Sequence, residues 1–244
     1  MRLQDNVYVV GGGSLGYDVS SPYDCNVYAV VQNTGVILID AGSGMGEDAL
    51  VRNLRADGLP IDRIHTLVLT HAHADHAGGA SGLRARLGVR VLASVLTASI
   101  VEAGDEERSS LDQARKDGVY PVGYRYAPCP IDLVIEEGDC IGDETFRLQV
   151  IQVPGHSADL IAFYEPVSKS LFSGDVVFEG GQLAVLSTPD FSLEQYQKSI
   201  ERLAKLEINR LYPGHGPAVL IDAKASLLAA QRRFEQGLPP VSIV

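Results

Sequence analysis

The sequence is poor in cysteine, in positive charge and in long apolar runs. Its three cysteines, Cys25, Cys129 and Cys140, are too few and too scattered for a disulfide framework. Its 20 Lys and Arg residues against 31 Asp and Glu residues give a net charge of -11, which repels phosphate backbones and speaks against a nucleic-acid partner. No apolar run approaches the roughly 20 residues that cross a membrane. Residues 1–6 lack the apolar core of a signal peptide. We therefore expect a cytoplasmic protein with no membrane partner.

The remaining composition is typical of a globular enzyme. Hydrophobic residues make up 45% of the 244 residues and charged residues 21%, which is enough for one large domain with a substantial core. We expect a single domain over residues 1–244 and a small molecule as the partner. The sequence leaves the oligomeric state open.

A glycine-rich stretch near the start imitates a nucleotide-binding motif. Gly11 to Gly16 fits G-x-G-x-x-G after a strand-like run at residues 7–10. That fingerprint requires a helix to begin at the glycines. Here a second strand-like run, residues 26–31, follows instead, so we predict a β-connection and no nucleotide site.

The most informative segment holds three imidazoles and a carboxylate within six residues. His71, His73, Asp75 and His76 follow the apolar, β-favouring run of residues 66–70. If the backbone stays extended, His71 and His73 point to the same side and can share one metal ion. Asp75 and His76 lie past the turn and would face a second, neighbouring ion.

Three further residues of the same chemistry end strand-like runs later in the chain. His156 and His215 each follow a Pro-Gly turn, and Asp175 follows Gly174. Hydrolytic metal sites use His nitrogen and carboxylate oxygen and keep one position for water. The sixth histidine, His65, stands alone before a buried strand, and we expect it to pack or to meet solvent.

This pattern resembles the metallo-β-lactamase superfamily, whose order is H-x-H-x-D-H, a distal His, a bridging Asp and a final His. The local sequences around His156, Asp175 and His215 are most similar to those of the glyoxalase II-like branch. The resemblance implies that His71, His73 and His156 hold one metal, that Asp75, His76 and His215 hold the other, and that Asp175 bridges them. The resemblance also covers residues 36–42, and it implies that Asp40 would contact a metal ligand without binding the metal itself. The alternative for Asp40 is a turn carboxylate that only bonds nearby amides.

The resembled family has an αββα sandwich, an α/β fold with two sheets inside and helices outside. Helices are expected over residues 48–57, after Ser192 and after Asp222. Residues 192–195 have the form of a capping box. Asp222 would cap the last helix, which is expected to end at Gly237.

The implied chemistry is hydrolysis at a dinuclear centre. Two divalent metals roughly 3.5–4 Å apart would share a hydroxide, because coordination lowers the pKa of water to around 7. Asp75 is the candidate to hold and shuttle its proton. Zinc is the expected metal, with manganese or iron as alternatives. The predicted reaction is cleavage of a small ester, thioester or lactone.

Two other activities stay open. Persulfide dioxygenases share the fold and motif but use one iron, and their Arg-x-Asp turn is absent from residues 180–185. A β-lactamase is the weaker alternative. The B1 enzymes carry Cys where Asp175 stands, and the B3 enzymes lack a bridging Asp. Acyl-homoserine lactonases carry a Tyr where this chain has Phe178, which makes Phe178 a candidate substrate contact.

The chain departs from the common pattern between His76 and His156. Two strands and one helix do not fill this interval, so we expect an insert at about residues 95–130. Residues 102–116 are charged and compatible with a helix. Tyr120, Tyr124 and Tyr126 then fall in a Gly/Pro loop. They would either cover the edge of the sandwich where the metals are expected and contact substrate, or pack the insert onto the domain.

Overall fold

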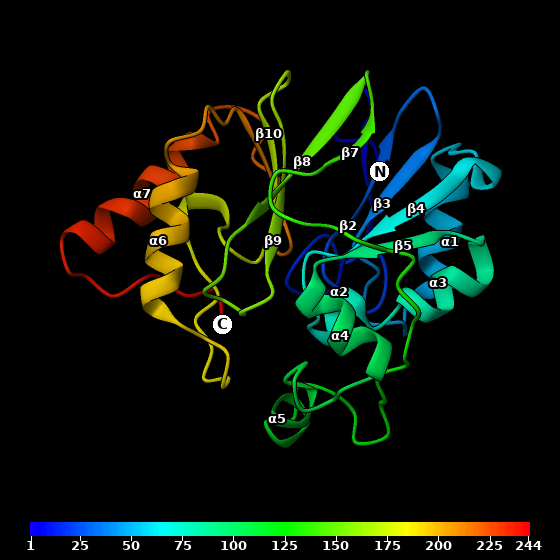
Figure 1. Cartoon of the computed structure of the whole chain (residues 1–244), viewed down its shortest axis with the longest axis horizontal. Helices are drawn as coiled ribbons and strands as arrows, with labels where there is room; N and C mark the ends of the chain where they lie inside the picture. The colour runs from blue at the N-terminus through cyan, green and yellow to red at the C-terminus, as the bar shows by residue number, and fades with distance from the viewer. The chain divides into compact units, whose positions relative to one another are not determined.

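The computed structural model describes residues 1–244 and divides into two compact units, residues 1–135 and 136–244 (Figure 1). Each unit is built on one sheet, and each is described by itself. The expectation of two β-rich halves with interspersed helices is confirmed. The expectation of a single domain over residues 1–244 stays a prediction.

The first unit contains a six-stranded sheet in sequential order. Its strands are β1 (Val7–Gly11), β2 (Val27–Val31), β3 (Val36–Ile39), β4 (Ile64–Val68), β5 (Arg90–Ala93) and β6 (Leu133–Val134). The pairs β1–β2 and β2–β3 are antiparallel, whereas β3 to β6 run parallel. All four residues of β3 are buried, as expected for a strand in the middle of the sheet. The carboxyl ends of β3 and β4 therefore lie at one edge of this sheet.

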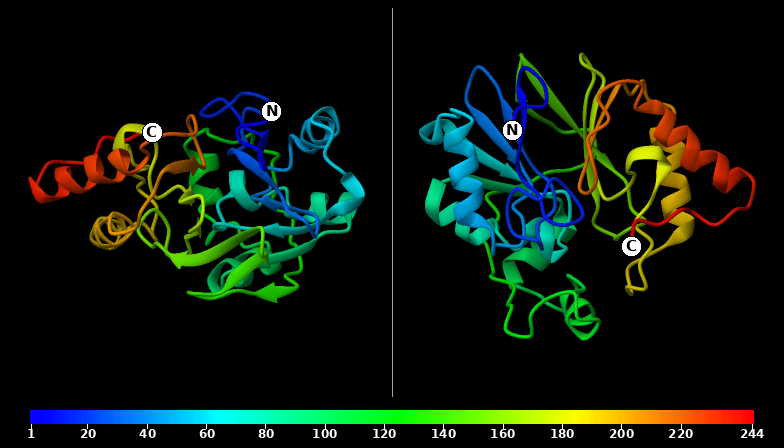
Figure 2. Two further views of the ribbon diagram at one scale, coloured as in Figure 1. Left: turned by 90° about the horizontal axis from the view of Figure 1, so that it is seen from above. Right: turned by 180° about the vertical axis from the view of Figure 1, so that it is seen from behind.

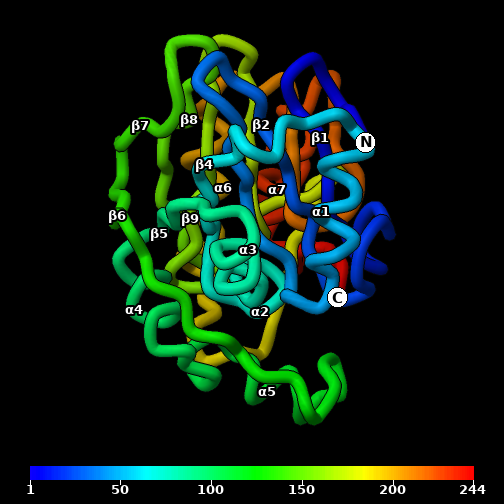
Figure 3. The backbone as a smooth tube through the Cα atoms, turned by 90° about the vertical axis from the view of Figure 1, so that its right-hand side faces the viewer, coloured from blue at the N-terminus to red at the C-terminus, as the bar shows by residue number.

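The helices of the first unit are α1 (Glu47–Ala56), α2 (Ala74–Ala77), α3 (Ala80–Leu87), α4 (Val95–Ala103) and α5 (Leu111–Lys116), with a 3-10 turn, η1 (Ile61–Arg63). Of these, α1, α3 and α4 contact strands of the sheet, whereas α5 lies apart from it (Figure 3). The helix expected over residues 48–57 is confirmed as α1, which buries Leu50, Val51 and Leu54 on one face. No helix starts in the glycine-rich stretch 11–16, so a nucleotide fingerprint is excluded there.

The second unit contains a five-stranded sheet in the order β11-β10-β9-β8-β7. Its strands are β7 (Cys140–Asp143), β8 (Phe146–Gln152), β9 (Ile161–Glu165), β10 (Ser170–Gly174) and β11 (Arg210–Pro213). Only β10 and β11 pair in parallel. The ends of β10 and β11 are thus neighbours, which places the residues that follow them on one edge.

Two helices, α6 (Leu193–Leu203) and α7 (Lys224–Glu235), pack together on one side of this sheet (Figure 2). A 3-10 turn, η2 (Glu179–Gly181), follows β10. Half of the predicted capping box of α6 is confirmed: the Ser192 hydroxyl accepts a hydrogen bond from Gln195 N at 3.3 Å, whereas Ser192 N donates to the Gly155 carbonyl at 2.8 Å. None of the helices in the structure is long and apolar enough to cross a membrane.

Two local predictions are wrong. Residues 102–116 do not form one helix, because Gly104 and Ser110 adopt left-handed φ values of 60° and 59° and separate α4 from α5. Asp222 does not cap α7: its own φ is 53°, Ala223 takes the cap position, and no side chain caps the helix. In both cases a left-handed residue turns the chain before the helix can continue or begin.

Candidate metal centre

The N-terminal ligand group, defined as His71, His73, Asp75 and His76, lies just beyond β4. His71 and His73 are in the irregular segment before α2, and Asp75 and His76 are in α2 itself. The ring centroids of His71 lie 4.6 Å from His73 and 4.1 Å from His76. The Nε2 of His76 lies 3.4 Å from the Oδ2 of Asp75. Buried imidazoles this close, beside a carboxylate, offer donor atoms that one cation can share.

Hydrogen bonds fix the ring orientation of two of these histidines. The Nδ1 of His76 donates to the Oδ2 of Asp40 at 2.8 Å. The Thr70 hydroxyl donates to the same carboxylate at 2.9 Å and so accepts from the Nδ1 of His71 at 3.0 Å. Both rings therefore carry the proton on Nδ1 and the lone pair on Nε2, the tautomer that suits a metal ligand.

The Asp40 carboxylate accepts several hydrogen bonds at this group. Asp40 follows β3 with a left-handed φ of 63°, a conformation that Asp tolerates better than most residues. Its carboxylate also accepts a hydrogen bond from Thr70 N at 2.8 Å. Both of the open interpretations for Asp40 thus describe real contacts, since it bonds a backbone amide and supports a histidine.

Cys25 is a neighbour that the sequence pattern did not indicate. Its thiol is fully buried, and the ligand atoms of Cys25, Asp40 and His76 lie within 4.8 Å of one another. Burial raises the pKa of Cys25 far above its usual range, so the group stays a neutral thiol. No spacing rule connects residue 25 to the histidines, which is why sequence reasoning missed it.

The C-terminal ligand group, defined as His156, Asp175 and His215, belongs to the second unit. The Oδ2 of Asp175 lies 3.6 Å from the Nε2 of His156 and 3.4 Å from the Nε2 of His215. The Nδ1 of His156 donates to the Ala184 carbonyl at 3.1 Å, which again puts the lone pair on Nε2. All three residues are buried. One carboxylate oxygen is thus placed to share a cation with either imidazole.

Tyr196 supports this group from α6. Its hydroxyl donates to the Asp175 carbonyl at 2.6 Å and accepts from Ala184 N at 3.2 Å. It therefore ties the turn that carries Asp175 to the segment whose carbonyl orients His156. The capping pattern predicted the helix, but nothing in the sequence indicated what this side chain contacts.

Tyr196→Phe is expected to lower the free energy of unfolding by about 1–3 kcal/mol, because it leaves a buried carbonyl and a buried N–H without their shared partner. Metal affinity should fall as well. Tyr164→Phe is the matched control, since Tyr164 donates only to the Glu207 carbonyl, at 2.7 Å and away from the ligand turns. Chemical denaturation and metal titration of both variants check this. A loss of metal affinity in both variants alike would contradict it.

The candidate substrate contacts are largely buried. Tyr120 and Tyr126 are 8% and 4% exposed and pack in the core of the first unit, with Tyr124 partly buried beside them. Burial and the nearby Asp75 carboxylate raise the pKa of Tyr124, so its hydroxyl stays protonated. Phe178 is 1% exposed, and its ring lies 6.1 Å from that of His215. That any of the four touches substrate stays a prediction.

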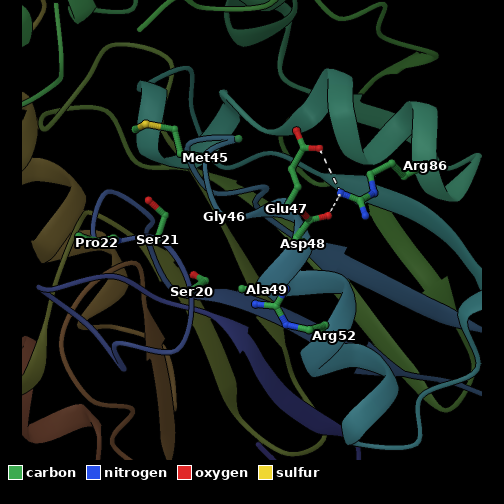
Figure 4. Close-up of a pocket in the computed structure, with 11 residues that line it drawn as sticks. Ser20, Ser21, Pro22, Met45, Gly46, Glu47, Asp48, Ala49, Arg52 and Arg86 are labelled. Atoms are coloured by element: carbon green, nitrogen blue, oxygen red, sulfur yellow. Dashed lines mark ion pairs between the residues drawn. The ribbon is translucent and has the colours of Figure 1, made fainter.

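A pocket of about 390 Å³ lies elsewhere in the first unit (Figure 4). Residues 20–22, residues 44–46, the start of α1 and Arg86 of α3 line it. Arg86 pairs with Asp48 at 2.7 Å and with Glu47 at 3.8 Å. None of the predicted ligands or tyrosines lines this pocket, so we assign it no part in the metal chemistry.

A model of the Metallo-beta-lactamase superfamily matches residues 21–215, a span that contains both ligand groups. The chain belongs to the metallo-β-lactamase superfamily. Membership and the His/Asp clusters together point to divalent metal binding.

Relatives in this superfamily carry the names of thioester hydrolases. The atrochrysone carboxyl ACP thioesterase of Aspergillus fumigatus is 27% identical over 195 residues, which are 80% of this chain and 51% of the relative. The acyl-coenzyme A thioesterase MBLAC2 of Gallus gallus is 30% identical over 78% of this chain and 72% of its own length. The hydroxyacylglutathione hydrolase GloC of Haemophilus influenzae is 29% identical over 63% of this chain and 69% of its own length. The chain spans only about half the length of the fungal thioesterase.

Solved structures of the superfamily show the same fold. A metallo-beta-lactamase family protein from Thermus thermophilus aligns with a TM-score of 0.73 at 23% identity, over 96% of this chain and 81% of that one. BJP-1, a subclass B3 metallo-beta-lactamase of Bradyrhizobium japonicum, also gives 0.73, at 20% identity over 97% and 91%. The predicted superfamily, its glyoxalase II-like branch and its α/β fold are therefore confirmed. The predicted hydrolase agrees with the names of the sequence relatives.

Proposed function

We propose that this chain is a metal-dependent thioesterase whose substrate is a small acyl thioester. The observation that carries the proposal is the donor set: five histidines and two aspartates follow strand ends in the family's order. Three of the histidines are held in the tautomer that presents Nε2. The names of the sequence relatives support the thioester as the bond that is cleaved.

The two ligand groups are proposed to meet at one dinuclear centre. His71, His73 and His156 would hold one ion, Asp75, His76 and His215 the other, and Asp175 would bridge. Imidazole nitrogen and carboxylate oxygen suit zinc, and they also accept manganese or iron. Bound divalent ions would supply Lewis-acid activation of water and of the thioester carbonyl.

Asp75 is the residue that we assign to proton transfer. Its side chain keeps 21% exposure, whereas the side chain of the adjacent ligand His76 is fully buried. Its carboxylate can therefore exchange a proton with solvent or with a departing thiolate while the buried imidazole stays in place. The hydrogen bonds between Asp40 and His76 and between Thr70 and His71 keep the two rings in position during this transfer.

A substrate panel tests the proposal. Zinc-loaded protein should hydrolyse acyl-coenzyme A or hydroxyacylglutathione thioesters with kcat/KM at least ~100-fold above that for an oxygen ester with the same acyl group. A lactone, a β-lactam and a phosphodiester complete the panel, and oxygen uptake with a glutathione persulfide tests the dioxygenase. Turnover confined to the β-lactam, or oxygen uptake by a single-iron form, would reject the thioesterase.

A further inference from the structure

Two tyrosines of residues 95–130, where an insert is expected, contact the main chain between members of the N-terminal ligand group. The Tyr126 hydroxyl donates to the Ala72 carbonyl at 3.0 Å. The Tyr124 hydroxyl donates to the Ser43 carbonyl at 2.7 Å and lies 3.5 Å from the Ala74 carbonyl. Ala72 and Ala74 alternate with the ligands His71, His73 and Asp75 along the chain. The Tyr126 hydroxyl therefore bonds the backbone between the ligands directly, and the Tyr124 hydroxyl bonds Ser43 while it lies beside that backbone.

Most of the contacted backbone lies outside regular structure, with Ala74 as the first residue of α2. Residues 69–73 lie in neither strand nor helix, between the end of β4 and the start of α2. Carbonyls in such a segment must find partners outside a regular ladder, and small shifts of this backbone move every ligand on it. Gly78 makes the approach possible, because a Cβ there would lie 2.2 Å from the Tyr124 hydroxyl.

Contacts within residues 95–130 brace this segment internally. Arg115 donates to the Tyr124 carbonyl at 2.9 Å and to Glu106 at 2.5 Å. Glu106 in turn accepts from Tyr126 N at 3.0 Å. The rings of Tyr120 and Tyr124 stack with centroids 5.0 Å apart. These contacts hold Tyr124 and Tyr126 in place relative to each other.

We propose that Tyr124 and Tyr126 are positioning residues that clamp the ligand-bearing loop, so that the insert sets the metal affinity of the N-terminal ligand group. The inference rests on the proposed function in that the loop is taken to bind the catalytic metal. Tyr120 differs from both, because its ring stacks in the same cluster without a hydroxyl contact to this loop.

The test compares Tyr124→Phe, Tyr126→Phe and the double variant with Tyr120→Phe as the matched control. Each change removes one oxygen and keeps the ring, so the packing is retained. Zinc affinity is measured by competition with a chromophoric chelator, and ligand geometry by the visible spectrum of the cobalt-substituted protein. We expect roughly tenfold weaker zinc binding for each single variant, a larger loss for the double variant, and an altered cobalt spectrum. Tyr120→Phe should match the parent in both measurements.

Other outcomes overturn the clamp. If the double variant keeps the parent's zinc affinity and cobalt spectrum while the metal-free protein melts lower, the tyrosines only pack the insert. If metal affinity holds and kcat/KM changes unequally across substrates, they contact substrate as a lid does. Neither metal measurement uses turnover. A parent that binds zinc but cleaves no thioester therefore refutes the proposed function and leaves the clamp to be decided by affinity.

Discussion

Asp175→Ala should lower turnover at least ~100-fold and reduce the metal content of the dialysed protein. The reason lies within the second unit, where one oxygen of Asp175 stands 3.6 Å from His156 Nε2 and 3.4 Å from His215 Nε2. Without that carboxylate, a cation near either imidazole loses its anionic ligand, and the two proposed ions lose their bridge. Elemental analysis after dialysis and steady-state kinetics measure the two effects.

Asp62→Ala is the matched control for this prediction. Asp62 is an exposed aspartate in η1, outside both ligand groups. Its removal changes the net charge equally, and it should alter neither metal content nor rate. An Asp175→Ala protein that keeps its full metal content and near-full activity would show that the bridging assignment is wrong.

Asp40→Asn should weaken metal binding by about 10–100-fold although it changes a single atom. The carboxylate accepts from Thr70 N, from the Thr70 hydroxyl and from His76 Nδ1. An amide has only one acceptor oxygen, and its NH₂ group must face one of these donors. If it faces His76, the ring must accept through Nδ1 and carry its proton on Nε2, where the metal would bind. If it faces Thr70, a buried N–H is left unsatisfied, at a cost of about 1–3 kcal/mol.

Nitrogen NMR of the His76 ring in the metal-free protein distinguishes the two tautomers, and chelator competition gives the affinity. Asp62→Asn supplies the control for the chemical change. Unchanged zinc affinity in Asp40→Asn would mean that this aspartate does not orient His76.

Local patterns explain why much of the fold could be predicted from the sequence. The buried run of β3 and the hydroxyl cap at Ser192 depend on residues close together in the chain, and both are confirmed. The starts of α5 and α7 were mispredicted, because they depend on single left-handed residues, Ser110 and Asp222. Neither position holds glycine, the residue that usually marks a left-handed turn in a sequence.

The ligands could be predicted from the sequence because their spacing is short or their turns are distinctive. The residues that support them could not be predicted in this way. The Tyr124 hydroxyl bonds a carbonyl 81 residues away, and the Tyr126 hydroxyl one 54 residues away. Tyr196 and Cys25 likewise reach the ligand groups only through the folded chain. Contacts of this separation follow from packing, which periodicity and local motifs do not encode.

Our proposal is that seven side chains hold two divalent ions that are required to cleave a thioester. It is tested most directly by stepwise zinc addition to metal-free protein while the hydrolysis of an acyl-coenzyme A thioester is followed. We predict negligible hydrolysis without metal and a rate that rises until about two equivalents per chain are bound and then stays level. Hydrolysis that is independent of added metal, or a plateau at one equivalent with no second ion bound, would contradict the dinuclear account.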